Sequence, residues 1–242
     1  ALTFVRGDQH STLTYAELDA KTNQFARYLI ARGIGPEDIV GIMLERSQEM
    51  VIAILAVIKA GAAYLPMDMS QPSARLQFML KDSKAEYLIS TQETIVSIFE
   101  DAIPSQLSLI DLACSECVMS TDAYSSDKIS DLDRRRPLRA NNLVYLIYTS
   151  GSTGLPKGVG FLQGALVNLA LWQQATYPDL PKKVLQYSPI GFDVSAQEIV
   201  ATLTRGATLV LIDEQSRKDS FAMLEFIDKQ QIELLHVPYI VL

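Results

Sequence analysis

The sequence predicts an α/β fold in which strands and helices alternate and form largely parallel sheets packed with helices. Its 242 residues suffice for one large domain or two small ones, and its 48% hydrophobic content is that of a globular protein. Short apolar runs alternate along the chain with segments of helical periodicity. Because parallel strands need long crossover connections, which are usually helical, this alternation favours parallel sheets.

The first part of the chain, residues 1–112, follows this pattern. Thr14 and Glu17 have the spacing of a helix capping box, and Gly33 stands where the capped helix would end. Further helices are expected from a cap at Ser47 through 59, from Pro72 through 82, and near 92–100. The expected strands of this part are 39–44, 63–66, 85–90 and 107–112.

The pattern stops over 113–142, where serine, aspartate and the arginines at 134–136 dominate. We interpret this segment as a polar, solvated connection whose arginines are neutralised by nearby aspartates. A second α/β part is expected over 143–242. Its predicted strands are 143–148, 184–187, 207–212 and 232–237, and its predicted helices are 165–174, 194–204 and 221–230.

Charge and composition exclude several classes of function. The formal net charge is −7, and an acidic surface repels the phosphates of nucleic acids. The longest unbroken apolar run, residues 50–58, is far shorter than the roughly 20 residues that a membrane span requires. The N-terminus lacks the cationic stretch and apolar core of a signal peptide. From the charge and the short apolar runs, we expect no nucleic-acid or membrane partners. The presence of only two cysteines favours a reducing compartment, and we expect a cytoplasmic protein.

Cys114 and Cys117 have the C-x-x-C spacing of a redox pair or of half a zinc site. A structural zinc site needs four ligands, and the two histidines, His10 and His236, lie far away in the sequence. The acidic flanks of the pair disfavour the thiolate that redox chemistry needs. These observations favour cysteines without a metal or redox function. So few histidines also argue against a Ser-His-Asp hydrolase.

A glycine-rich turn over 149–158 follows directly on the apolar strand expected at 143–148. Its glycines permit positive φ angles and let backbone amides approach an anion closely. Its hydroxyl groups and Lys157 complete a set of groups that would bind a polyphosphate. The turn is not a Walker loop, because glycine follows the lysine where that motif has serine or threonine. A flexible surface turn has a similar composition, but it does not explain a single lysine after a buried strand.

This turn resembles the phosphate loop of the adenylate-forming enzymes, the superfamily of acyl-CoA synthetases, luciferases and adenylation domains of nonribosomal peptide synthetases. The resembling stretch is Tyr-Thr-Ser-Gly-Ser-Thr-Gly-Leu-Pro-Lys-Gly, residues 148–158. Three further stretches resemble core motifs of the family in the expected order, and they are residues 13–18, 58–68 and 192–199. The resemblance therefore covers nearly the whole chain.

The resemblance implies the fold of the large N-terminal lobe of these enzymes and an ATP-dependent ligase activity. The implied reaction joins a carboxylate to AMP with release of pyrophosphate, and a carrier-domain phosphopantetheine thiol then captures the acyl group. The implied cofactors are ATP and Mg²⁺, and the implied partners are an amino acid, a carrier domain and other modules of a larger synthetase. Residues 1–242 would form an incomplete lobe, with the Mg²⁺ ligand and the C-terminal lobe outside them. We therefore expect no complete adenylation by these residues alone.

The resemblance also assigns roles to individual residues. Lys157 and Thr149 are the implied catalytic residues. The implied phosphate-binding residues are Thr149, Ser150, Gly151, Ser152, Thr153, Gly154, Lys157 and Gly158. No metal ligand is assigned.

Asp193 separates the branches of the family. In members that activate amino acids, this aspartate pairs with the substrate ammonium group, and ligases for fatty or aryl acids generally lack it. A carboxylate in apolar surroundings is costly unless a cation meets it, which favours the pairing. The alternative is that Asp193 only caps the helix that follows.

The pocket for the substrate side chain is implied to contain Val194, Gln197 and His236. Gln197 and His236 would favour a polar side chain. The alternatives are an exposed helix position for Gln197, where the family often has an aromatic residue, and a core histidine for His236.

Two other functions stay open. An acyl- or aryl-CoA ligase of the same superfamily is disfavoured by Asp193. A non-catalytic nucleotide-binding module is suggested only by the stretch after Gly158, which lacks the basic residue that the family commonly has there.

Overall fold

The computed structural model describes residues 1–7, 9–99, 107–150, 155–176 and 181–237. Its contacts divide the chain into two compact units. Unit 1 comprises Ala1–Leu18, Arg46–Val51 and Leu166–Leu242, and unit 2 comprises Asp19–Glu45 and Ile52–Ala165. These units do not coincide with the expected parts 1–112 and 143–242, because parallel strand pairing joins segments far apart in the sequence.

Unit 2 is built on a six-stranded sheet with the strand order β6-β5-β3-β4-β7-β8. Within the described residues, every neighbouring pair is parallel except β7 and β8. The predicted α/β fold with largely parallel pairing is therefore confirmed. The strands are β3 (Ile39–Ile42), β4 (Ala63–Pro66), β5 (Tyr87–Ser90), β6 (Ser108–Asp111), β7 (Leu143–Thr149) and β8 (Lys157–Leu162).

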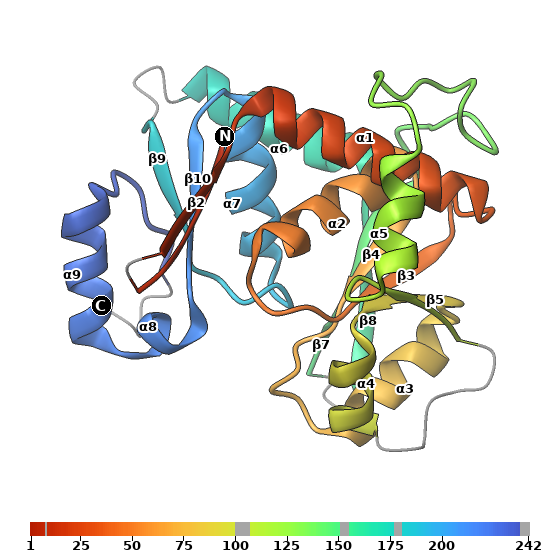
Figure 1. Ribbon diagram of the computed structural model, residues 1–242, viewed down its shortest axis with the longest axis horizontal. Helices are drawn as coiled ribbons and strands as arrows, with labels where there is room; N and C mark the ends of the chain where they lie inside the picture. The colour runs from red at the N-terminus through yellow and green to blue at the C-terminus, as the bar shows by residue number, and fades with distance from the viewer. Residues whose placement is uncertain (8, 100–106, 151–154, 177–180, 238–242) are drawn as a thin grey trace. The chain divides into compact units, whose positions relative to one another are not determined.

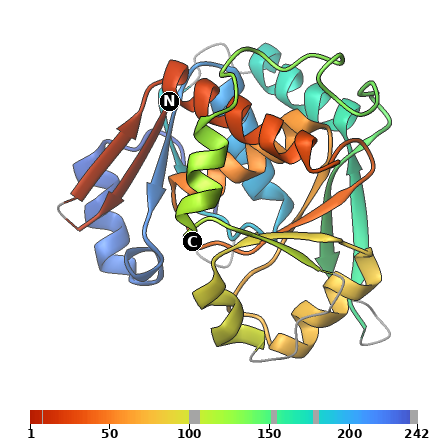
Figure 2. The same cartoon turned by 45° about the vertical axis from the view of Figure 1, so that its right-hand side comes forward.

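Helices cover both faces of this sheet. Figures 1 and 2 show α3 and α4 on one face and α1 and α2 on the other. On the face covered by α3, alternate residues of β4 and the chain just after it are buried, such as Leu65 and Met67. They pack in one core cluster with Leu76 and Leu80 of α3. The helices are α1 (Tyr15–Ala31), α2 (Gln48–Ala60), α3 (Ser73–Ser83), α4 (Gln92–Phe99) and α5 (Ser115–Asp122), and the first turns of α1 and α2 belong to unit 1.

The expected polar connection over 113–142 is more ordered than the sequence indicates. It contains α5, and Arg27 of α1 binds the segment that follows this helix. The Arg27 guanidinium donates to the Ser125 carbonyl at 3.0 Å and forms an ion pair with Asp133 at 3.2 Å. Of the three consecutive arginines, Arg134 pairs with Asp131 at 2.7 Å, as expected, and also donates to a carbonyl of α2.

Strand β8 is absent from the sequence predictions because its two glycines disfavour strands. The structure shows why glycine fits there. A Cβ atom on Gly160 would lie 2.7 Å from Leu143 Cδ2, and one on Gly158 would lie 3.2 Å from the Tyr148 ring. The glycines therefore let side chains of β7 lie flat across β8, and the two strands form an antiparallel hairpin.

Unit 1 contains a four-stranded sheet with the order β2-β1-β10-β9. The pair β1 and β2 forms an N-terminal hairpin that the sequence analysis did not predict, and α8 was also missed. The strand expected at 232–237 is reduced to one bridge between Val184 and Leu234. The elements are β1 (Leu2–Arg6), β2 (Gln9–Leu13), α6 (Gln163–Thr176), β9 (Lys183–Gln186), α7 (Asp193–Thr204), β10 (Thr208–Ile212), α8 (Glu214–Lys218) and α9 (Ser220–Gln230).

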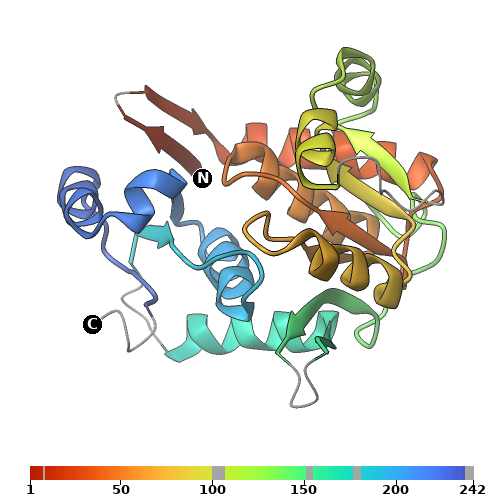
Figure 3. The same cartoon turned by 90° about the horizontal axis from the view of Figure 1, so that it is seen from below.

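Strand β9 directs alternate side chains to opposite faces of this sheet. Leu185, and Tyr187 just after the strand, pack in a core cluster with Phe226 of α9. Gln186 points to the other face, where its side chain reaches α7. Figures 1 and 3 show α7 and α9 on opposite sides of the sheet. The period of two thus places one buried glutamine against the helix that begins at Asp193.

The predicted capping box at the start of α1 is confirmed. The Thr14 amide donates to Glu17 Oε2 at 2.8 Å, and the Glu17 amide donates to Thr14 Oγ1 at 3.2 Å. We expect Thr14→Ala to lower the free energy of unfolding by about 1 kcal/mol, because it leaves a helix amide without its partner. Urea denaturation measures this loss. The control is Thr176→Ala at the exposed end of α6, and an equal loss there would contradict the capping role.

Candidate functional site

The expected phosphate loop connects the two strands of the β7–β8 hairpin. Thr149 and Lys157 are directly paired across it, so their side chains lie on the same face of the sheet. Both residues are exposed, as is Ser150. A hydroxyl and an ammonium group therefore stand together at the base of the turn. The predicted phosphate-binding residues 151–154 lie outside the described residues.

Tyr148, the residue before Thr149, anchors β7 next to this turn. Its side chain is 8% exposed, and its hydroxyl donates to Asp82 Oδ2 of α3 at 2.6 Å. Burial, with Asp82 beside it, raises the pKa of Tyr148, so the phenol stays protonated and remains a donor. The backbone next to Thr149 is thus tied to a helix of the same unit.

Asp193, the proposed substrate anchor, is the first residue of α7 and is exposed. Its Oδ1 accepts a hydrogen bond from the Val194 amide at 2.9 Å. The neighbouring Phe192 is 62% exposed, so the apolar enclosure on which we based the pairing argument is not found around Asp193 in unit 1. This contact is to the next residue only, and the N-cap position of α7 is Phe192, which makes no side-chain cap hydrogen bond, so the capping alternative is not found. The carboxylate is exposed.

The other predicted pocket residues also belong to unit 1. Val194 and Gln197 are half-buried and lie on the first turns of α7, close to Asp193 in sequence. His236 is half-buried on the segment after α9, and its pKa is lowered by burial and by the charge of Arg205. Thr149, Ser150, Lys157 and Gly158 belong to unit 2.

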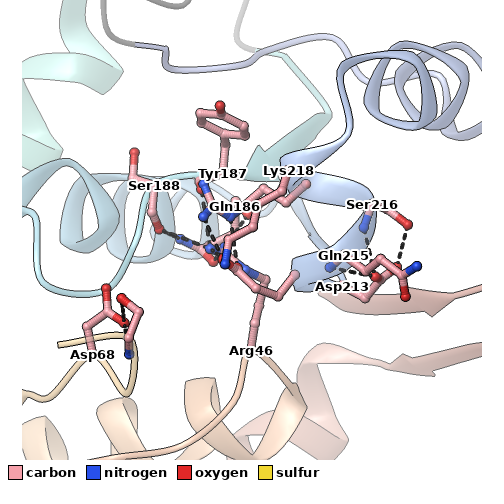
Figure 4. Close-up of polar contacts among 12 residues, drawn as sticks. Arg46, Asp68, Gln186, Tyr187, Ser188, Asp213, Gln215, Ser216 and Lys218 are labelled. Atoms are coloured by element: carbon pink, nitrogen blue, oxygen red, sulfur yellow. Dashed lines mark hydrogen bonds and ion pairs between the residues drawn. The ribbon is translucent and has the colours of Figure 1, made fainter. Parts of the chain in front are cut away.

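The sequence analysis missed a buried polar network in unit 1 that joins Arg46, Gln186 and Glu198. The Arg46 guanidinium donates to the Gln186 carbonyl at 2.6 Å and to the side-chain oxygen of the same residue. Gln186 Nε2 in turn donates to Glu198 Oε2 at 2.9 Å. Figure 4 shows the Arg46 side chain directed toward Gln186 and Ser188. The network therefore runs from the chain after β3, through the end of β9, into α7.

Glu198 is 1% exposed, and its carboxylate accepts hydrogen bonds from Gln186 and Ser188. Besides Gln186, the Ser188 amide donates at 3.1 and 3.2 Å and the Ser188 hydroxyl at 3.0 Å. Burial nevertheless dominates and raises the pKa of Glu198 to about 7, although these donors and the charge of Arg46 act in the opposite direction. Glu198 is therefore harder to ionise than an ordinary glutamate.

The sequence does contain a signal for this network. In α7 the polar residues Gln197 and Glu198 stand between Ala196 and Ile199, and Gln186 follows the apolar residues Val184 and Leu185 of β9. A charged or amide side chain at a position where periodicity predicts burial indicates a partnered polar site. The partner Arg46 lies 140 residues away from Gln186, so only the tertiary structure identifies it.

The raised pKa of Glu198 predicts that stability falls as pH rises. Between the ordinary value of 4.5 and about 7, the folded protein keeps a proton that the unfolded chain has released. The free energy of unfolding should therefore decrease across this window, by at most about 3 kcal/mol from this group. Urea denaturation at about pH 5 and about pH 8 measures the change.

The control for this prediction is Glu198→Gln, which should reduce the pH dependence in that window. His236, whose pKa is lowered, contributes the opposite slope below 6.5, so the difference between the two proteins isolates Glu198. Glu214, whose pKa is lowered to about 2, acts only at more acidic pH. Equal pH dependence in both proteins would contradict the raised pKa.

Several other kinds of site are absent from the described part of the chain. No cluster of three or more His, Cys, Asp or Glu side chains there is placed to hold a metal ion. Cys114 is exposed, and Cys117 is buried with its thiol donating to the Tyr28 hydroxyl at 3.3 Å. None of the described helices combines the length and apolar character that crossing a membrane requires.

Comparisons with protein families, with curated proteins and with solved structures all find similar proteins. The model of the AMP-binding enzyme family matches residues 1–241. Zwittermicin A synthase ZmaJ of Bacillus cereus is 39% identical over 93% of this chain and 41% of its own length. Tyrocidine synthase 3 of Brevibacillus parabrevis is 38% identical over 93% of this chain, which spans 3% of that protein. The N-terminal subdomain of Klebsiella oxytoca NpsA, solved in complex with 3-hydroxybenzoyl-AMSN, is 27% identical with a TM-score of 0.76, over 96% of this chain and 54% of that one.

Proposed function

The chain belongs to the AMP-binding enzyme family, and we propose that it is part of an amino-acid-activating adenylation domain of a nonribosomal peptide synthetase. The proposed reaction converts ATP and an amino acid into aminoacyl-AMP and pyrophosphate. The aminoacyl group then passes to the phosphopantetheine thiol of a carrier domain. The proposed setting is a larger synthetase, since the chain spans less than half the length of both the zwittermicin and the tyrocidine synthase. The proposed location is the cytoplasm.

The observation that carries this proposal is the exposed carboxylate of Asp193 at the first turn of α7. An amino acid presents an ammonium group, and a carboxylate that is open to a ligand can pair with it. Neither a fatty acid nor a simple aryl acid carries such a cation. Asp193 would therefore anchor the substrate, while Val194, Gln197 and His236 would contact its side chain.

The proposed chemistry depends on charge neutralisation. The substrate carboxylate oxygen attacks the α-phosphorus of ATP, and the bond to the β-phosphate oxygen breaks so that pyrophosphate leaves with the electron pair. Lys157 and the Thr149 hydroxyl, which share a face of the hairpin, would hold the β- and γ-phosphates and stabilise the leaving pyrophosphate. Ser150, Gly158 and the turn over 151–154 would add further donors. Mg²⁺ supplies additional neutralisation when bound, and none of the described residues is assigned to it.

An aryl acid is the second candidate substrate. It is favoured by the Klebsiella oxytoca neighbour, whose structure holds a 3-hydroxybenzoyl compound. Against it stands Asp193, since a carboxylate beside an uncharged aryl group gains no ion pair.

The test is a substrate panel on the natural protein that carries this chain. ATP–pyrophosphate exchange is measured with single amino acids, with aryl acids and with fatty acids. We expect exchange that depends on one amino acid or a few related ones. Exchange with aryl or fatty acids alone would overturn the proposal in favour of the second candidate or another ligase. ATP binding without exchange for any acid would favour a non-catalytic nucleotide-binding module.

A further inference from the structure

We propose that Arg46 and Glu198 are positioning residues, which act through Gln186 and Ser188 to hold the Asp193 carboxylate in one place for the substrate ammonium group. This inference rests on the proposed function, because it assigns a task to residues that would not touch the substrate. It is carried by hydrogen bonds that fix the backbone between the end of β9 and the start of α7.

Arg46 fixes the first part of this segment. Its guanidinium donates to the carbonyl groups of Gln186, Tyr187 and Ser188, at 2.6, 3.3 and 3.5 Å. The Arg46 side chain is only 6% exposed, and a Glu214 carboxylate oxygen lies 3.8 Å from its guanidinium. Consecutive carbonyls bound by one planar guanidinium cannot rotate independently, so the chain leaving β9 has a defined direction.

Glu198 fixes the same segment from the helix side. The residue lies on the second turn of α7, and its carboxylate binds both the amide and the hydroxyl group of Ser188. Gln186 connects the two anchors, because its side-chain oxygen accepts from Arg46 while its side-chain nitrogen donates to Glu198. The helix that begins at Asp193 is therefore tied to the end of β9 by buried charge-assisted hydrogen bonds.

Residues 189–195, the rest of this segment, form hydrogen bonds with one another. The Phe192 amide donates to the Pro189 carbonyl at 3.0 Å. The Ser195 hydroxyl donates to the carbonyls of Ile190 and Phe192 at 3.2 and 2.6 Å. These hydrogen bonds connect the residues that lead into Asp193 to one another and to the first turn of α7. Asp193 itself is exposed, so its position is set by the backbone and not by packing of its own side chain.

Stability alone does not explain a network of this kind. Burying a carboxylate and a guanidinium is costly, and well-packed apolar residues of similar volume are often equally or more stable. Apolar packing does not hold a backbone group in one orientation. Hydrogen bonds do, because they join backbone groups to specific partners. A binding carboxylate that must be held to a fraction of an ångström gains from such support.

The test compares Glu198→Ala, Glu198→Gln and Arg46→Lys with the unaltered natural protein by two measurements. Amide hydrogen exchange over 188–195 should become at least about tenfold faster in Glu198→Ala, because the local opening becomes easier. In ATP–pyrophosphate exchange, the KM for the amino acid should rise about tenfold to a hundredfold, while the KM for ATP stays within about twofold. Glu198→Gln should retain part of the function, since it keeps one acceptor oxygen at the same distance.

The control for a purely structural role is Thr14→Ala, which destabilises the same unit without touching this network. It should leave the KM for the amino acid unchanged. The proposal is overturned if exchange over 188–195 is unaltered in Glu198→Ala, or if a loosened segment leaves that KM unchanged in an active protein. A wild-type protein that activates no amino acid would instead refute the proposed function, and hydrogen exchange would still show whether the network holds the segment.

Discussion

Replacing Lys157 with alanine should slow amino-acid-dependent ATP–pyrophosphate exchange by about 10²-fold, the scale for losing one electrostatic stabiliser of developing charge. Lys157 is exposed at the first position of β8, directly opposite Thr149. Its ammonium group can therefore reach a ligand bound over the turn without disturbing a packed core. The loss should be in kcat, because the charge on the departing pyrophosphate develops in the transition state.

Two further variants make this prediction specific. Lys157→Arg keeps the positive charge but places it on a larger, planar group, so its exchange rate should lie between those of Lys157→Ala and the unaltered protein. Lys21→Ala removes an exposed lysine from α1 in the same unit, and it should have no effect on exchange. Unchanged turnover in Lys157→Ala would remove this residue from phosphate chemistry.

Replacing Asp193 with alanine should lower kcat/KM for the amino acid by about 10² to 10³-fold, since truncating one partner of a close charge pair costs several kcal/mol. The KM for ATP should change little, because Asp193 is assigned to the amino acid alone. Steady-state exchange kinetics with each substrate varied in turn measure both quantities. Asp193→Asn, which keeps the shape without the charge, should be similarly impaired.

A structural role of Asp193 at the start of α7 requires its own control. Asp219 caps α9 in the same unit, with Oδ1 accepting from the Phe221 amide at 2.9 Å. Asp219→Ala should cost about 1 kcal/mol of stability and leave both KM values unchanged. If Asp193→Ala weakened ATP and amino acid equally, the residue would have a folding role and the substrate assignment would be wrong.

Local patterns were sufficient to predict most of the individual elements. The capping box at Thr14 and Glu17, the Ser47 cap at the start of α2 and the turn after β7 all depend on neighbours within a few residues. The structure confirms the first two by hydrogen bonds between the predicted groups. The family's four motifs were also readable, because each is a continuous stretch. The roles assigned to Asp193, Val194, Gln197 and His236 remain predictions.

Elements whose stability comes from distant partners could not be predicted in the same way. Strand β8 has an unfavourable composition and exists because Gly158 and Gly160 accept the side chains of β7. The expected strand at 232–237 has a favourable composition, yet it makes only one bridge to β9. In both cases pairing and packing override local propensity.

The sequence by itself determined the α/β class and most of the individual helices and strands, and the phosphate chemistry of the turn before Lys157 stays a prediction. These properties depend on periodicity and on short-range spacing, which a linear chain displays directly. The tertiary structure alone decided which strands pair and which buried groups meet. Arg46 and Glu198 carry charges into the interior from distant segments, and their hydrogen bonds exist only once the sheet has brought those segments together.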